Sequence, residues 1–419
     1  MADLITLGKN AKAAAAELNR LTDEKINAAL LAVAKELRKQ GSAIKEQNAI
    51  DVENAKKKGL SAAFIDRLTL TDKVIEGIAV GIEQVAALKS PRGKCVYSYV
   101  NQYQGVTVEK INVPFGVIGI IYESRPNVTA DAFALCFKTA NAVILKGGSD
   151  AFWSNKAIVD TIKCALKECG LPLDAVTLIE DNSRETTAEF MKLDKYVDLL
   201  IPRGSASLIN ATKQNATIPV IETGTGNCHV YVDKYADTDM AAEVIFNAKT
   251  QRYSVCNACE SLVINSKIID EALPKIAAKL KEKQVEIRCD DRAYEVIKDY
   301  PYLAKATEED FYTEYGAAII SVKTVDCICE AIAHINEHST HHSESIITSN
   351  TERAEKFLHE IDSSTVYHNA STRFSDGFEF GLGAEIGIST QKLHARGPMG
   401  LEALVTTKYV GRADGAVRK

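Results

Sequence analysis

The feature that most constrains the fold is a regular alternation of strand-like and helix-like segments that begins at Pro114. Short apolar runs alternate with longer amphipathic runs, which favour buried strands and covering helices respectively. Strands are expected at 116–122, 141–146, 175–180 and 197–201, with helices at 129–140, 155–169 and 206–212. Such alternation predicts an α/β fold with a doubly wound, mainly parallel sheet. A second α/β block is expected over about 229–390, with strands at 260–265, 317–322, 345–348 and 365–368.

The chain before Pro114 has a different pattern. Apolar residues recur at helical spacing within residues 1–90, and Thr71 is a candidate N-cap for a helix over 73–88. Residues 95–100 and 106–113 are β-rich and flank a turn-like segment at 101–105, which predicts a hairpin. The hairpin is either an oligomerisation arm or an ordinary edge hairpin.

The composition and charge of the chain limit the classes of function that it can have. The 419 residues are 46% hydrophobic and 25% charged, and the net charge of -6 argues against a general nucleic-acid surface. The apolar runs are shorter than the ~20 residues that a membrane helix needs, and the first residues lack the pattern of a signal peptide. Ten scattered cysteines in a chain of this size are typical of reduced thiols. A soluble cytoplasmic protein is expected.

Two glycine-containing turns follow expected strands. One comprises Lys146, Gly147, Gly148 and Ser149, and the other comprises Arg203, Gly204 and Ser205. Glycine lets a backbone approach a phosphate closely, and a lysine supplies a counter-charge. We expect both turns at the carboxyl ends of neighbouring strands, facing one crevice, which is where open α/β sheets bind ligands. The spacing of the common dinucleotide fingerprint is absent.

A polar segment at 251–260 contains Cys256 and Cys259, ahead of an apolar strand. Three interpretations remain open: a redox pair or half of a zinc site, a single thiolate nucleophile activated by Arg252 and backbone amides, or two buried thiols. The chain has no second Cys-x-x-Cys, and a strand rather than a helix follows the pair. Structural zinc is therefore not expected.

Glu222 and a cluster of three histidines are further candidates for functional residues. Glu222 stands at the end of an expected strand at 218–221, ahead of a glycine-rich turn, where it could be an acid/base or could cap the turn. His338, His341 and His342 are clustered in sequence, but their spacing matches no common metal site. A surface loop is the favoured interpretation of the histidines, and no metal site is predicted.

Several strings together carry a resemblance to a known family. They are PFGVIG at 114–119, YESRPNVT at 122–129, ILKGGS at 144–149, IPRG at 201–204, PVIETGTGNCH at 219–229, VCNA at 255–258 and QKLHARGPMGLE at 391–402. In this order they resemble the aldehyde dehydrogenase superfamily, and specifically its γ-glutamyl phosphate reductases. The chain departs from that pattern at Tyr253, where the family usually has proline, and at 337–342.

The resemblance implies an aldehyde-dehydrogenase-like architecture of three parts. Residues 1–96 and 114–226 would form a Rossmann-type NADP-binding domain, and 227–393 an α/β catalytic domain. The hairpin at 97–113 and the carboxyl-terminal segment 394–419 would form an oligomerisation element, which implies a homo-oligomer.

The resemblance also implies a reaction. Cys256 would attack L-glutamyl 5-phosphate, and the thioester would be reduced by NADPH to L-glutamate 5-semialdehyde, the second step of proline biosynthesis. The position of Cys259 has no recognised role. Transient contact with glutamate 5-kinase is a further implied partner. The alternatives are a hydrolytic NAD(P)-dependent semialdehyde dehydrogenase that uses Cys256 and Glu222, and a catalytically silent redox or metal-binding protein built on Cys256 and Cys259.

Roles for individual residues follow from the resemblance in the same way. The backbone N–H of Cys256 and a nearby asparagine, Asn127 or its competitor Asn257, would stabilise the oxyanion. Glu222 aligns with the glutamate that activates water in hydrolytic relatives. Glu314 would contact the nicotinamide ribose.

The remaining candidate residues are expected to select the cofactor or to anchor the substrate. Ser149 stands where NAD-preferring relatives have an acidic residue, and Lys146 offers a counter-charge, so NADP(H) is expected to bind better than NAD(H). Arg125 and Arg396 are the expected anchors for the phosphate or the α-carboxylate of the substrate.

Overall fold

The structure, a computed structural model, describes residues 3–102 and 104–418. The chain forms two compact units. The first comprises Met1–Thr223, Gly381–Gly387 and Met399–Lys419, and the second comprises Gly224–Phe380 and Ile388–Pro398. Each unit contains its own parallel sheet. The predicted α/β class with doubly wound parallel sheets is confirmed.

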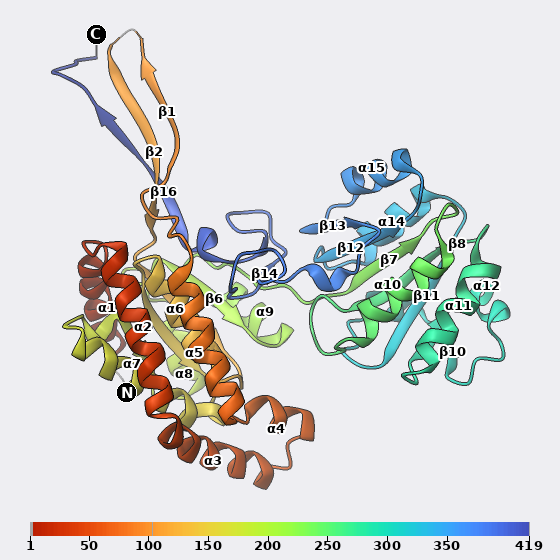
Figure 1. Ribbon diagram of the computed structural model, residues 1–419, viewed down its shortest axis with the longest axis horizontal. Coiled ribbons are helices and arrows are strands. Elements are labelled where there is room, and N and C mark those ends of the chain that lie inside the picture. Colours follow the sequence, from red (N-terminus) through yellow and green to blue (C-terminus); the bar gives the residue numbers. More distant parts are fainter. Residues whose placement is uncertain (1–2, 103, 419) are drawn as a thin grey trace. The chain divides into compact units, whose positions relative to one another are not determined.

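Five helices precede the first sheet, as predicted for residues 1–90. They are α1 (Leu4–Leu18), α2 (Asp23–Lys39), α3 (Gly41–Lys57), α4 (Ala62–Leu68) and α5 (Asp72–Ala87). The predicted N-cap is confirmed, because the Thr71 hydroxyl accepts a hydrogen bond from the backbone N–H of Val74 at 3.3 Å. The apolar stripe of α2 is fully buried, including Ile26, Leu30 and Val33. These helices stand beside the first sheet in Figure 1.

The first sheet has the strand order β5-β4-β3-β6, and all of its strands are parallel. The strands are β3 (Val117–Tyr122), β4 (Ala142–Gly147), β5 (Val176–Leu178) and β6 (Leu199–Arg203), connected by α6 (Asn127–Lys138), α7 (Phe152–Glu168) and α8 (Arg184–Phe190), with α9 (Ala206–Asn215) after β6. Every residue of β3 and β4 is buried. The chain runs from β3 to β4 and β5 on one side and then returns to β6 on the other, so the order reverses between β3 and β6.

The prediction of a strand at 218–221 is wrong. That segment makes only an isolated bridge, between Leu200 and Val220. Pro219 in its middle has no N–H to contribute to a ladder, although its carbonyl accepts from the Leu200 N–H at 2.9 Å.

An antiparallel ribbon of three strands completes the first unit (Figure 1). It has the order β1-β2-β16, with β1 at Cys95–Asn101, β2 at Val106–Pro114 and β16 at Val405–Arg412. The predicted hairpin is confirmed by the pairing of β1 with β2. Tyr97 and Tyr409 meet across the ribbon, with their hydroxyl oxygens 2.9 Å apart.

The second unit is built on a seven-stranded parallel sheet in the order β10-β9-β11-β8-β7-β12-β13. Its strands are β7 (Cys228–Val232), β8 (Cys259–Asn265), β9 (Glu286–Cys289), β10 (Leu303–Lys305), β11 (Ile319–Val325), β12 (Ser343–Ile347) and β13 (Thr365–His368). Its helices are α10 (Thr238–Thr250), α11 (Ile269–Lys281), α12 (Asp291–Val296), α13 (Glu308–Tyr312), α14 (Ile328–His338) and α15 (Thr351–Glu360). A short antiparallel pair, β14 (Ile388–Ser389) and β15 (Gly397–Pro398), also belongs to this unit.

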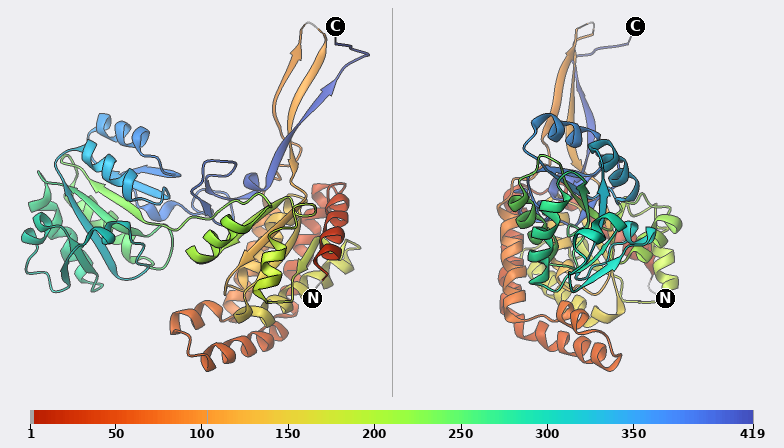
Figure 2. Two further views of the ribbon diagram at one scale, coloured as in Figure 1. Left: turned by 180° about the vertical axis from the view of Figure 1, so that it is seen from behind. Right: turned by 90° about the vertical axis from the view of Figure 1, so that its right-hand side faces the viewer.

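Alternate residues of the central strands face two separate apolar clusters. Val230 and Leu262 pack in the cluster that contains the buried faces of α10 and α11. Tyr231 and Val263, one residue further along each strand, pack in the cluster of α14 and α15. Helices therefore cover both faces of this sheet (Figure 2), which explains why its strands are apolar throughout.

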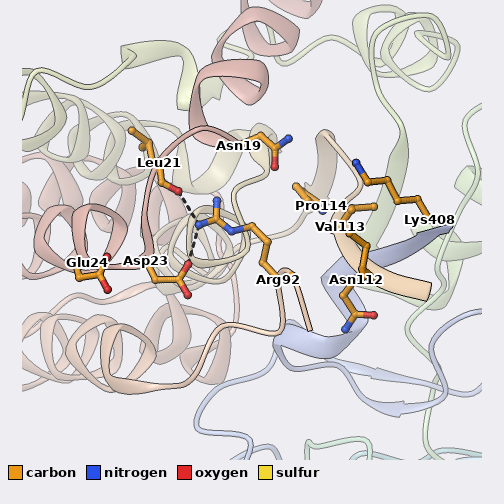
Figure 3. Close-up of a pocket in the computed structure, with 11 residues that line it drawn as sticks. Asn19, Leu21, Asp23, Glu24, Arg92, Asn112, Val113, Pro114 and Lys408 are labelled. Carbon is orange, nitrogen blue, oxygen red and sulfur yellow. Dashed lines mark hydrogen bonds and ion pairs between the residues drawn. The ribbon is translucent and has the colours of Figure 1, made fainter. Parts of the chain in front are cut away.

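A pocket of about 440 Å³ lies in the first unit, beside the base of the ribbon (Figure 3). Arg92 crosses it to donate hydrogen bonds to the Leu21 carbonyl and to Asp23, both at 2.8 Å. Asn112 and Lys408 of the ribbon line the same pocket. Its lining includes none of the predicted site residues. Across residues 3–102 and 104–418, no helix combines the length and the apolar character that crossing a bilayer requires.

Candidate active site

The loops after β3 and β6 meet where the strand order of the first sheet reverses. Tyr122, the last residue of β3, is in register with Gly147 at the end of β4 and with Arg203 at the end of β6. The two glycine turns therefore flank β3 instead of following neighbouring strands, which corrects the expected placement. Open α/β sheets bind ligands at such a reversal, at the carboxyl ends of the strands.

Glu123 connects the loops after β3 and β6. Its carboxylate accepts from the backbone N–H of Ser205 at 2.7 Å and from the Ser205 hydroxyl at 3.1 Å. A Cβ on Gly204 would lie 2.4 Å from the same carboxylate, so a larger residue there would displace the Glu123 side chain. The adjacent Ser124 has a left-handed backbone with φ of 30°, a strained conformation that persists only where the surroundings impose it. Arg125 follows, with an exposed side chain.

Lys146 is the penultimate residue of β4 and is buried. Its ammonium donates to the carbonyl of Gly147 at 3.2 Å and to the side-chain oxygen of Asn182 at 3.4 Å. Burial lowers the pKa of Lys146, and the charge of Asp181 opposes that change. Both hydrogen-bond partners are neutral, so the positive charge can still attract an anion. Ser149 lies two residues beyond Gly147, exposed in a short 3-10 turn.

Asn127 is the first residue of α6, directly after the loop of β3. Its side-chain amide donates to Asp131, one turn later, at 3.1 Å. Burial raises the pKa of Asp131 to about 6, against the lowering effects of Asn127 and Arg203. An acidic group thus faces the predicted oxyanion donor, and sequence reasoning had not identified it.

Cys256 lies half-buried in the segment that joins α10 to β8. Its backbone is tightly enclosed: a Cβ on Gly226 would fall 1.5 Å from the Cys256 carbonyl oxygen. The thiol of Cys228 donates to the same oxygen at 3.1 Å. The glycine-rich turn predicted around Glu222 therefore supports the predicted nucleophile through Gly226, two residues before β7.

A second segment, residues 371–376, holds the other side of this loop. The buried side-chain amide of Asn257 donates to the carbonyl of Ser375 at 2.9 Å and to that of Arg373 at 3.4 Å. The hydroxyl of Thr372 donates to the Asn257 carbonyl at 2.7 Å. Arg373 also donates through Nε to the side chain of Gln251 at 2.9 Å.

The guanidinium of Arg373 interacts electrostatically with Cys256, the predicted nucleophile. Burial lowers the pKa of its guanidinium, and the charges of Asp376 and Cys256 oppose that effect. A positive charge beside a cysteine favours the reactive thiolate. Nothing in the sequence around Arg373 pointed to Cys256, which is more than a hundred residues earlier.

Cys259 differs from Cys256 in its surroundings. It is fully buried at the start of β8, in register with Cys228 of β7. Burial raises the pKa of Cys259 to about 12 and that of Cys228 well above its usual value. Both therefore remain thiols at neutral pH, and none of the ten cysteines, all of which the structure describes, forms a disulfide.

The remaining candidates have other partners, each within its own unit. Glu222 forms an ion pair with Lys213 at 3.1 Å in the first unit. Glu314 is exposed, and its neighbour Gly316 donates its backbone N–H to the Glu260 carboxylate at 3.2 Å. Arg396 donates to Asp362 at 2.8 Å in the second unit.

The prediction of a surface loop is wrong for two of the three clustered histidines, because His338 ends α14 and both His338 and His342 are buried. His338 contacts Glu308 at 3.1 Å, His341 contacts the Asp362 carbonyl at 2.6 Å, and His342 contacts the Ser343 hydroxyl at 2.9 Å. Over the residues that the structure describes, no three histidine, cysteine or carboxylate side chains gather as a metal site would require.

Comparison with known proteins decides the family. The model of the aldehyde dehydrogenase family matches residues 2–296 and 304–410. The chain is 50% identical over 418 residues to a gamma-glutamyl phosphate reductase of Listeria monocytogenes and 53% identical over 417 residues to one of Ligilactobacillus salivarius. The matches cover all of this chain and 100% and 99% of those proteins. The chain belongs to the aldehyde dehydrogenase family, among its γ-glutamyl phosphate reductases.

A solved structure agrees with this assignment. The crystal structure of a gamma-glutamyl phosphate reductase from Thermotoga maritima has a TM-score of 0.96, with 46% sequence identity and full coverage of both chains. The resemblance and the fold inferred from sequence are thus confirmed. The roles of single residues and of the three predicted parts of the chain remain predictions.

Proposed function

We propose that the chain reduces L-glutamyl 5-phosphate to L-glutamate 5-semialdehyde and phosphate with NADPH, as an oxidoreductase of proline biosynthesis. The observation that carries this proposal is Cys256, a half-buried thiol on a loop enclosed by Gly226 and supported by Asn257. The printed names of relatives aligned over their full length supply the substrate. The buried Cys259 supports a single-nucleophile mechanism over a redox pair.

In the proposed reaction, the Cys256 thiolate attacks the acyl carbon of the substrate. A carbon–sulfur bond forms, and phosphate leaves with the electrons of the broken carbon–oxygen bond. NADPH, when bound, supplies the hydride that reduces the resulting thioester. The tetrahedral thiohemiacetal then breaks its carbon–sulfur bond, which releases the aldehyde and regenerates the thiolate. Acyl phosphate, NADPH and one proton are consumed for each aldehyde, phosphate and NADP formed.

Two groups of this chain would stabilise charge during that reaction. The guanidinium of Arg373 would favour the Cys256 thiolate. The oxyanion would accept hydrogen bonds from the backbone N–H of Cys256 and from Asn127. Because the Asn257 amide already donates to two backbone carbonyls, its proposed role is to position the loop.

The residues predicted to bind a nicotinamide cofactor suit it in chemical type. Lys146, whose hydrogen-bond partners are neutral oxygens, would hold the 2′-phosphate of NADPH, and Ser149 would not repel it. The loops at Gly147–Gly148 and at Arg203–Gly204–Ser205 would carry the rest of the dinucleotide. Glu314 would bind the nicotinamide ribose.

Substrate anchoring and assembly complete the proposal. Arg125 and Arg396 would bind the phosphate or the α-carboxylate of the substrate. The ion pair of Glu222 with Lys213 favours a structural role over water activation. The ribbon exposes Tyr99, Val100 and other apolar side chains on an outer strand, so a second copy of this chain is its proposed partner. Contact with glutamate 5-kinase would shorten the path of the labile acyl phosphate.

Substitution of each cysteine in turn tests the mechanism. Cys256→Ser should abolish turnover, because a serine hydroxyl is a far weaker nucleophile than a thiolate. Cys259→Ser should retain most of the activity. Equal losses in the two variants would contradict a single nucleophile at Cys256 and favour a paired role.

A further inference from the structure

Two opposite charges are completely buried in the second unit. Lys249 lies on α10 and Glu260 lies on β8, both are 0% exposed, and the Lys249 ammonium is 2.5 Å from a Glu260 carboxylate oxygen. Burial raises the pKa of Glu260, and the charge of Lys249 opposes that rise. Removing two charges from water is costly, and apolar residues of similar volume often replace such a pair without loss of stability. A contribution to stability alone therefore does not explain why the protein has this buried ion pair.

The position of the pair suggests what it does. Lys249 is in the last turn of α10, and Glu260 is the second residue of β8, so the two flank the segment 250–259. Cys256 lies in that segment, most of which is outside regular helix and strand. The ion pair joins the two ends of the loop by a contact that water does not reach. Such a contact limits how far the ends of the loop can move apart.

The second oxygen of Glu260 reaches another loop. It accepts the backbone N–H of Gly316 at 3.2 Å. Gly316 has a left-handed backbone, with φ of 58°, and is two residues after Glu314. The neighbouring Tyr315 is anchored separately, because its hydroxyl donates to Asp310 at 2.9 Å. One carboxylate thus bonds to both the end of the Cys256 loop and the loop of Glu314.

We propose that Lys249 and Glu260 are positioning residues that hold the Cys256 loop and the Glu314 loop in one fixed geometry. The inference deepens the proposed function, since Glu314 is the residue proposed to bind the nicotinamide ribose. Lys249 orients one carboxylate oxygen of Glu260, and the other oxygen is then aimed at the Gly316 N–H. Neutralising the pair releases both loops together.

Two variants distinguish an effect on the position of the two loops from an effect on the overall stability of the protein. Lys249→Met combined with Glu260→Leu removes both charges and keeps the volume. Glu260→Gln keeps the shape of the side chain and removes the charge. The matched control is the ion pair of Asp233 with Arg353, whose carboxylate is also 0% exposed but which joins the end of β7 to α15. The control variant is Asp233→Leu with Arg353→Met.

Three quantities are measured on each full-length variant. The first is the rate of iodoacetamide alkylation at Cys256, followed by mass spectrometry of its peptide, because other cysteines are exposed. The second is the KM for NADP in phosphate-dependent oxidation of glutamate 5-semialdehyde. The third is the thermal midpoint. Alkylation needs neither cofactor nor substrate, so it reports on the loop even if the proposed function fails.

Both test variants should change the alkylation rate at Cys256 at least about tenfold, because release of the loop changes the exposure of the thiol and the charges beside it, which set its thiolate fraction. Their KM for NADP should rise, while the double variant keeps a thermal midpoint near that of the parent. The control variant should leave alkylation and KM unchanged, whatever its midpoint. The proposal is overturned if Glu260→Gln or the double variant keeps the parent alkylation rate and KM, or if the control lowers both equally.

Discussion

Gly226 provides the sharpest test of how the predicted nucleophile is held. In Gly226→Ala the new Cβ would lie 1.5 Å from the carbonyl oxygen of Cys256, 2.3 Å from its carbonyl carbon and 2.6 Å from its Cα. All three are backbone atoms, so no side chain can rotate away. Carbon–oxygen contacts in proteins are about 3.3 Å or longer, so the two backbones must separate by about 1.8 Å.

Such a displacement exceeds what catalysis tolerates. Misplacement by about 1 Å can reduce turnover about 100-fold, and overpacking typically destabilises a protein by about 1–3 kcal/mol. Gly226→Ala should therefore lower kcat at least about 100-fold. It should also change the alkylation rate at Cys256, measured by peptide mass spectrometry, while the far-ultraviolet circular dichroism stays that of a folded protein.

A second glycine supplies the control. Gly81 lies inside α5, and a Cβ there would meet nothing within 4 Å. Gly81→Ala should preserve turnover and stabilise the protein by about 0.5–1 kcal/mol, because glycine is unfavourable within helices. If Gly226→Ala alkylated and turned over within a factor of two of the parent, the close enclosure of the Cys256 backbone would be refuted.

Three further predictions concern charged residues. Arg373→Met should slow alkylation of Cys256 at neutral pH about tenfold by raising the pKa of its thiol, whereas Arg373→Lys should retain most of the rate; equal rates in all three proteins would refute a role in thiolate formation. Burial raises the pKa of Asp131 in the folded protein to about 6, from an ordinary value of 3.8. Ionisation of Asp131 therefore destabilises the folded state increasingly as the pH rises from about 4 to 6, and fully above that. Asp131→Asn should raise the urea midpoint at pH 7.5, and this gain should disappear below about pH 4. An unchanged midpoint at pH 7.5 would contradict that assignment. Glu222→Gln should retain most of the reductive turnover, because Glu222 is paired with Lys213, and a loss as deep as that of Cys256→Ser would favour direct participation.

The sequence predicted the elements whose signals are local. Apolar strands such as β3 and β4 and the N-cap of Thr71 depend on a few adjacent residues, and the structure has them where expected. The segment 218–221 had a strand-like composition, but Pro219 prevents a continuous ladder. The short strands β9 and β10 were not predicted, since four and three residues carry little periodic signal.

The contacts that support the candidate site could not be predicted in the same way. The motif strings marked the loops of Cys256 and Glu222, but Arg373 is separated from Cys256 by more than a hundred residues. The enclosure of the Cys256 carbonyl by Gly226 depends on how strands β7 and β8 pair. Glu123 stood within a quoted string, yet its bond to Ser205 appears only when β3 and β6 lie side by side.

The most direct test of the proposed reaction is its reverse, NADPH formation from glutamate 5-semialdehyde and NADP with and without inorganic phosphate. In an acyl-phosphate reductase, phosphate must attack the Cys256 thioester to release the product. The rate should therefore rise with phosphate concentration to saturation, and arsenate should substitute for phosphate. Turnover at the full rate without either anion would contradict the account and favour a hydrolytic dehydrogenase.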